Sequence, residues 1–178
     1  MIEEHIERVE EILSRWTNEL GSDERAYKNH VYRVVNFCFA LHAGSAEERE
    51  KVVVAACFHD LGIWANGTFD YLAPSIALAK SYLADCHREE WSSEIERMID
   101  QHHKVRDVHD DAHPLIEAFR RSDLVDVSYG VVKFGLSRAL VRDVQARFPD
   151  AGFHWRLVQL SARWWLQHPF RPVPVLKW

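Results

Sequence analysis

A run of seven apolar residues, Val52 to Phe58, leads directly into His59 and Asp60, and Leu61 and Gly62 follow. A helical segment that is apolar on every face has to lie inside a folded domain, because none of its faces suits water. His59 and Asp60 therefore come where the chain is most buried, and a polar group buried without a partner is costly. We expect these two side chains either to satisfy each other or to hold a metal ion, and we expect Gly62 to end the helix.

Apolar residues recur at spacings of three and four along most of the chain, which is typical of amphipathic helices. We expect a first helix over 2–20, a second from Ser22 or Asp23 to about Leu41, and a third that Ser45 to Glu48 open as a capping box. Further helices are expected over about 74–84, from Ser92 or Ser93, from Pro114, over 137–148 and over 152–167, with a helical connection over 131–136.

No segment shows the period of two that is typical of strands, and no internal repeat or low-complexity linker divides the chain. The sequence therefore predicts an all-α fold, a single-domain helical bundle over residues 1–178. Its motif-bearing core is expected over about 29–128, with the helices over 137–167 packed on it.

The composition narrows the function classes. The chain has 178 residues, of which 47% are hydrophobic, and this is typical of one soluble globular domain. Its net charge of −5 argues against polymeric nucleic acid as a partner, but not against a small nucleotide. Three cysteines are too few and too irregular for a disulfide framework, and no apolar stretch approaches the roughly 20 residues that span a bilayer. We expect a cytoplasmic protein without a membrane partner.

Three predicted helices each turn a metal-type ligand toward the interior: His30, His59 with Asp60, and Asp123. Each of these residues takes a position on an apolar stripe where a hydrophobic residue would be expected. One inward polar residue per helix is how helical bundles build metal sites. Two imidazoles and two carboxylates suit one divalent ion, and they do not distinguish manganese, iron, nickel, cobalt, magnesium and zinc.

Alternative interpretations stay open. A lone histidine on an apolar stripe is more often a satisfied core residue, so the prediction rests on the coincidence of four such residues. Asp126 lies one turn after Asp123 on nearly the same helical face, either as an acceptor that orients a ligand histidine or as the ligand itself. The segment His109 to His113 also contains a His-Asp pair, but in a polar loop, where Asp110 or Asp111 can cap the next helix.

The ordered set His30, His59-Asp60 and Asp123 resembles the HD-domain superfamily of metal-dependent phosphohydrolases. The local contexts, Phe58 to Gly62 and Arg121 to Asp126, are similar to those of the family as well, and the resemblance covers about residues 29–128. It implies an all-helical bundle in which these four residues are the metal ligands. It also implies hydrolysis of a nucleotide or another small phosphate ester through a metal-activated water.

Two features depart from the family. Many members carry a lysine shortly after the glycine of the doublet, where this chain has Ile63-Trp64. Members with two metals usually carry a further histidine in the next segment, and residues 69–75 contain none. The resemblance therefore favours one ion, although His102-His103 is similar to a pair that two-metal relatives use and leaves room for a second.

In a phosphohydrolase of this kind, Asp60 would both ligate the ion and orient the attacking water. His102 or His103 would contact the phosphate or protonate the leaving oxygen, because an imidazole changes charge near pH 7. Lys104 and Arg106 could steer an anionic substrate, with solvated loop charges as the alternative. Trp64 could wall a pocket for a base, with plain core packing as the alternative.

Two other functions stay open on the same scaffold: a non-catalytic sensor that binds a nucleotide or a metal, and an oxygenase with two irons. The missing additional histidine argues against the oxygenase. The aromatic residues near the C-terminus could pack on the bundle or form the contact of a homodimer.

Overall fold

The computed structural model describes residues 1–110, 112–168 and 175, and every regular element in these residues is a helix. The all-α prediction is confirmed. Among the described residues, no helix combines the length and the apolar character that crossing a membrane requires. The helices are α1 (Glu7–Ser14), α2 (Thr17–Leu20), η1 (Gly21–Asp23), α3 (Glu24–Leu41), α4 (Ala46–Phe58), α5 (Gly62–Ala65), α6 (Leu72–Asp85), η2 (Glu89–Trp91), α7 (Ser92–Gln101), α8 (Pro114–Val127), α9 (Arg138–Arg147) and α10 (Phe153–Gln167).

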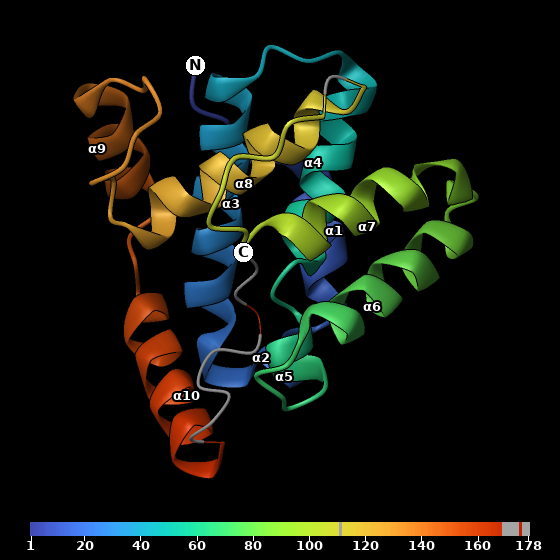
Figure 1. Cartoon of the computed structure of the whole chain (residues 1–178), viewed down its shortest axis with the longest axis vertical. Coiled ribbons are helices and arrows are strands. Elements are labelled where there is room, and N and C mark those ends of the chain that lie inside the picture. The colour runs from blue at the N-terminus through green and yellow to red at the C-terminus, as the bar shows by residue number, and fades with distance from the viewer. Residues whose placement is uncertain (111, 169–174, 176–178) are drawn as a thin grey trace.

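The long helix α3 runs through the middle of the bundle, and it packs against both α8 and α4 (Figure 1). On one side α6 and α7 form an antiparallel pair, and α7 also contacts α4 and α8. On the other side lie α9 and α10, which both touch α3. The helices that carry the predicted metal ligands are therefore neighbours at the centre of the molecule.

Helix α4 confirms the interpretation of the apolar run, because all seven residues from Val52 to Phe58 are buried. Its N-terminus carries the predicted capping box: the Glu48 backbone N–H donates to Ser45 Oγ at 3.2 Å, and Glu48 Oε2 accepts from the Ser45 backbone N–H at 2.7 Å. The helix ends at Phe58, so that His59 and Asp60 lie in the turn that follows it.

The prediction that Gly62 ends the helix is wrong, since Gly62 begins α5. A Cβ atom at this position would come within 2.7 Å of the Tyr71 carbonyl oxygen and 2.9 Å of Ser75 Oγ. The Gly62 N–H donates to the same Ser75 Oγ at 3.0 Å. A glycine is required here because the start of α6 packs directly on the backbone, and this contact holds Tyr71 beside the His59-Asp60 turn.

Other boundaries differ in ways that have local causes. The first predicted helix is split, because the N–H groups of Arg15 and Trp16 bond to carbonyls three residues back and close a tight turn between α1 and α2. The segment 131–136 is not helical: glycines at both of its ends adopt left-handed φ angles, 73° at Gly130 and 91° at Gly135. The helices from Pro114, over 137–148 and over 152–167 are confirmed as α8, α9 and α10 within one or two residues.

Replacing Gly62 by alanine tests this close packing. The added Cβ forces the Tyr71 carbonyl and α6 away from the turn, so we expect a loss of roughly 1–3 kcal/mol in the free energy of unfolding. Urea denaturation of the wild type and of Gly62→Ala measures the difference. An unchanged denaturation midpoint would contradict the packing at this glycine.

Candidate metal centre

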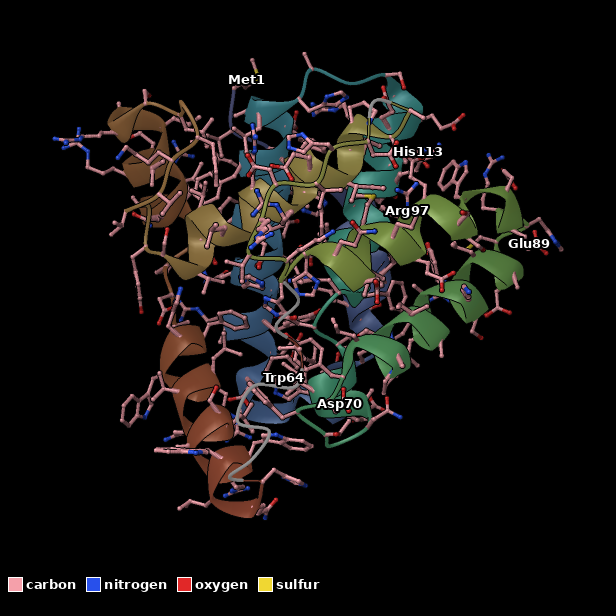
Figure 2. All side chains as sticks on the ribbon, viewed as in Figure 1. Met1, Trp64, Asp70, Glu89, Arg97 and His113 are labelled. Carbon is pink, nitrogen blue, oxygen red and sulfur yellow. The ribbon has the colours of Figure 1, made fainter. Side chains whose placement is uncertain are left out.

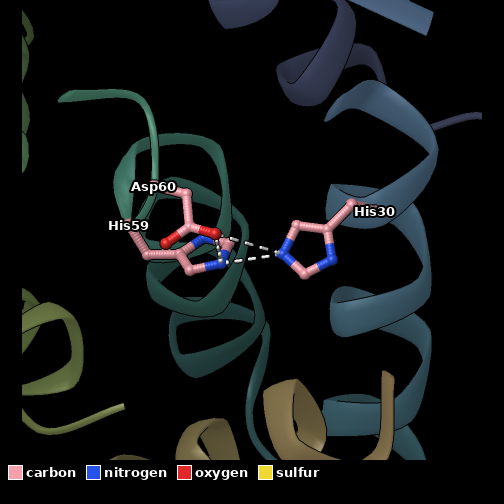
Figure 3. A group of neighbouring side chains, drawn as sticks. All are labelled: His30, His59 and Asp60. Carbon is pink, nitrogen blue, oxygen red and sulfur yellow. Dashed lines mark hydrogen bonds and ion pairs between the residues drawn. The ribbon is translucent and has the colours of Figure 1, made fainter. Parts of the chain in front are cut away.

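Four side chains, from α3, from the turn after α4 and from α8, converge at one place, and Figure 3 draws His30, His59 and Asp60 of this group. His30 Nε2 and His59 Nε2 face each other at 2.9 Å, and Asp60 Oδ2 lies 3.7 Å from the first and 3.5 Å from the second. Asp123 Oδ1 comes from the opposite helix, 3.6 Å from His30 Nε2 and 3.7 Å from His59 Nε2. All four residues are buried. The structure therefore brings the four predicted ligands together at one point.

The tautomers of the histidines are fixed by acceptors that lie outside this point. His59 Nδ1 donates to the Ala56 carbonyl at 2.8 Å, and His102 Nδ1 donates to the Ile99 carbonyl at 2.6 Å. His30 Nδ1 donates to Asp126 Oδ2 at 2.7 Å. A carbonyl oxygen can only accept, so the proton of each neutral ring lies on Nδ1 and the Nε2 lone pair is left to face the centre.

Three buried atoms at the centre have no hydrogen-bond partner within the described part of the chain: Asp60 Oδ1, Asp123 Oδ1 and His102 Nε2. Buried polar atoms are almost always satisfied, so three orphaned acceptors side by side require an explanation. Ligands bound at about 2.1 Å stand about 3.0–3.4 Å apart around a tetrahedral or octahedral ion. The two Nε2 atoms lie 2.9 Å from each other and 3.5–3.7 Å from Asp60 Oδ2 and Asp123 Oδ1, which is close to that spacing. These buried groups could hold a metal ion.

A second group shares Asp60 with the first, because Asp60, His102 and His103 also place ligand atoms close together. His102 Nε2 lies 3.4 Å from Asp60 Oδ1, the oxygen that faces away from His30 and His59. The Tyr71 hydroxyl is 2.6 Å from His103 Nε2, and the His103 side chain is 21% exposed. His103 is thus the member of the cluster that reaches the surface.

The electrostatics of the cluster keep its carboxylates ionised. Burial opposes ionisation of Asp60, but the facing imidazoles outweigh it and hold its pKa well below the usual range. Burial would likewise lower the pKa of His59, but the carboxylates of Asp60 and Asp123 raise it to about 9. Burial dominates at His30 and lowers its pKa. In the absence of an ion, the positive charge that balances these carboxylates is therefore a proton on His59.

Asp126 lies on the far side of His30, outside the point where the four ligands meet. Arg33 donates two hydrogen bonds to the Asp126 carboxylate, Nε to Oδ1 at 2.5 Å and Nη2 to Oδ2 at 2.8 Å. Arg33 also donates to the Phe148 carbonyl. Burial opposes ionisation of Asp126, but the bonds from His30 and Arg33 lower its pKa to about 2. Asp126 therefore takes the place of the acceptor that orients His30, and the geometry argues against it as a competing ligand.

The residues predicted to contact substrate lie outside the cluster. Trp64 packs 4.9 Å from Tyr27, ring centre to ring centre, and its Nε1–H donates to Asp23 Oδ2 at 2.9 Å. Lys104 follows His103 directly and is half-buried, and Arg106 is exposed in the loop beyond it. Their contact with a substrate stays a prediction. In the rival segment, Asp110 pairs with Arg97 and accepts from the N–H groups that precede α8, and Asp111 lies outside the described residues.

Sequence reasoning missed two residues that shape the centre: Arg33 and Phe153. Arg33 follows His30 by three residues, so its place on the same side of α3 could have been found from helical spacing. Phe153 stacks on the His30 ring at 4.0 Å, with 14° between the ring planes. It comes from α10, more than 120 residues away in sequence, and no local pattern predicts that contact.

Comparison of the chain with protein-family models, with curated proteins and with solved structures gave no match.

Replacing Asp126 by asparagine tests the orientation of His30. The amide can still pair with His30 but no longer fixes the proton on Nδ1, so we expect metal affinity to fall by about 10–100-fold. Calorimetric titration of the metal-free protein with Mn²⁺ or Zn²⁺ measures this. Asp143→Asn, on the exposed face of α9, is the matched control, and equal affinities in the two variants would contradict the role of Asp126.

The raised pKa of His59, about 9, makes metal binding depend on pH. Its folded-state pKa exceeds the unfolded value of about 6.5, so the proton stabilises the metal-free protein fully below pH ~6.5 and this contribution is lost as the pH rises through 9. An ion has to displace that proton, so metal affinity should rise over the same interval. Thermal unfolding with chelator and with Mn²⁺ measures both trends. A stabilisation by metal that does not grow with pH would contradict the assignment.

Proposed function

We propose that this chain is a metal-dependent phosphohydrolase that acts on a small phosphate ester such as a nucleotide. The single observation that carries the proposal is the meeting of two imidazole Nε2 atoms and two carboxylates at one buried point. The order of these residues along the chain and their local contexts resemble those of the HD-domain superfamily, and this supports the same reaction. We propose one divalent ion at His30, His59, Asp60 and Asp123.

A divalent ion bound there would lower the pKa of a water molecule in its coordination shell toward neutrality and so supply the nucleophile. Asp60 offers one oxygen to the ligand set, while its other oxygen, Oδ1, has no partner and is available to accept a hydrogen bond from that water. The same carboxylate thereby orients the water for in-line attack on phosphorus. Exclusion of bulk water from the buried site would strengthen these interactions.

His103 is the better candidate of the two adjacent histidines for contact with the substrate. Burial raises the pKa of Tyr71 well above its ordinary value, so its hydroxyl stays protonated and can donate to His103 Nε2, 2.6 Å away. The proton of His103 then lies on Nδ1, 4.0 Å from Asp123 Oδ2 and on the open side of the cluster. From there it can donate a hydrogen bond to a phosphate oxygen. Burial and the neighbouring His102 lower the pKa of His103 to about 3, so the ring is neutral and is too weak an acid to protonate the leaving oxygen.

His102 presents a different ring nitrogen to the cluster. Its Nδ1–H is used by the Ile99 carbonyl, and its buried Nε2 faces Asp60 Oδ1 without a proton. A nitrogen of this kind can accept a proton from the attacking water or ligate a second ion beside Asp60.

A screen of phosphate esters tests the proposal. We expect release of phosphate from at least one small ester with manganese, nickel or cobalt, and none after removal of metal with a chelator. His59→Ala should lower the rate by at least about 100-fold, because loss of a ligand should exceed the effect of losing a supporting residue. His109→Ala, an exposed histidine of the loop before α8, is the control and should leave the rate unchanged.

Activity that survives both the chelator and His59→Ala would exclude the metal-dependent mechanism. The absence of hydrolysis across nucleotides and simple esters, with metal bound at the site, would exclude phosphohydrolase activity and leave a binding protein.

A further inference from the structure

Helix α10 carries apolar side chains on two faces: Phe153, Leu157 and Leu160 pack toward the core, and a second set is exposed. Trp155, Val158, Trp165 and Leu166 are 55–84% exposed, whereas Phe153 at its first turn is buried. On the side that faces the bundle, two turns apart, stand Arg156 and Arg163. The two arginines flank the packed leucines at the edge of this face, where they line a cleft.

A cleft of about 350 Å³ lies between this inner face and the segment around α5. Figure 2 labels Trp64 and Asp70 at the lower end of the molecule, toward which α10 also extends. The volume is at the lower end of the range for small-molecule sites, roughly 300–1,000 Å³. The lining side chains that matter for recognition are Glu19, Trp64, Phe69, Arg156, Arg163 and Trp164.

Aromatic rings from two separate segments line the cleft. Phe69 and Trp164 lie 6.4 Å apart between ring centres, one from the loop after α5 and one from α10. Trp64 is held in place because its Nε1–H donates to Asp23 Oδ2, and Arg156 Nε lies 2.9 Å from the same oxygen. Trp164 stacks on His168 with 3.9 Å between ring centres, and this contact fixes the plane of its ring. A heteroaromatic base can stack on aromatic rings whose planes are fixed.

Polar groups in the cleft suit the edges of a base. No carboxylate of the described residues forms an ion pair with Arg163, whose side chain is exposed, whereas Arg156 is paired with Asp23. The guanidinium of Arg163 can donate to a carbonyl oxygen or a ring nitrogen of a base, and its plane can stack on the ring. The Glu19 carboxylate offers an acceptor for the amino group of a base or for a ribose hydroxyl.

A single side chain, Tyr71 at one end and Phe153 at the other, separates the rings that line the cleft from the histidines of the metal centre. Phe69 contacts Tyr71 with 6.0 Å between ring centres, and the Tyr71 hydroxyl bonds to His103. On the other side, Trp64 lies 6.4 Å from Phe153, which stacks on His30. A ligand whose ring fills the cleft can therefore direct its phosphate toward the exposed edge of His103.

A larger groove of about 790 Å³ between the N-terminal segment and α4 has a different character. Its arginines are paired with its own glutamates, Arg8 with Glu11 and Arg49 with Glu3. Phe39 is the aromatic hydrocarbon ring among the described residues that line it, so this groove lacks the facing aromatic rings of the cleft.

We propose that the cleft between α10 and the α5 segment binds the base of a mononucleotide, stacked on Trp64, Phe69 and Trp164 and contacted at its edge by Arg163 and Glu19. The identification of this ligand as the substrate of the centre rests on the proposed phosphohydrolase function, whereas the binding itself does not.

Calorimetric titration of the His59→Ala protein with guanosine monophosphate in the presence of chelator tests binding without turnover. Guanine carries both a carbonyl oxygen and an amino group, and ribose 5-phosphate is the matched probe without a base. We expect ribose 5-phosphate to bind at least about tenfold more weakly, because base stacking and edge contacts are lost. Trp164→Leu and Arg163→Ala should each weaken binding of the nucleotide by about fivefold or more.

The controls are Trp165→Leu, which changes the exposed neighbour of Trp164, and Arg142→Ala on the exposed face of α9. Both should bind guanosine monophosphate as the His59→Ala parent does, and circular dichroism confirms that each variant is folded. Equal binding of the two probes, equal effects of Trp164→Leu and Trp165→Leu, or no binding of the nucleotide would overturn the inference. Binding that depends on Arg163 in a protein that hydrolyses nothing would support the cleft and reject the phosphohydrolase.

Discussion

The structure depends on the hydrogen bonds that orient its buried histidines. His30, His59 and His102 each donate Nδ1–H to an acceptor that lies away from the centre. For His30 the acceptor is Asp126, and for the other two it is a backbone carbonyl three residues earlier. When the rings are neutral, each therefore faces the centre with a nitrogen that carries no proton. A core histidine that served only packing would satisfy both nitrogens, and here the second nitrogen meets only other acceptors or another imidazole.

The rest of the fold supports this arrangement. The apolar helix α4 buries the His59-Asp60 turn, and the glycine after that turn lets α6 bring Tyr71 to His103. The Arg33–Asp126 pair adds a buried charge network behind His30 and joins α3 to α8. Removal of one partner would leave a buried charge without compensation, so the pair links the orientation of a ligand histidine to the integrity of the bundle.

The sequence predicted the parts of this molecule that depend on short-range patterns. Helical spacing and apolar context placed His30 and Asp123 on inward faces, and the capping box at Ser45 placed the start of α4. The contacts that could not be predicted join distant segments. Phe153 on His30 and the close approach of α6 to Gly62 arise from tertiary packing, which leaves no periodic trace in the chain. Left-handed turns likewise replaced the helix expected over 131–136.

The most direct measurement is anomalous X-ray scattering from crystals of the wild-type protein grown with Mn²⁺. We predict a strong peak between His30, His59, Asp60 and Asp123, with ligand distances near 2.1 Å. A second, weaker peak beside His102 would place two ions on the shared carboxylate of Asp60 and would keep the centre as described. Absence of a peak among the four ligands at saturating metal, or a peak only in the loop before α8, would contradict the metal centre.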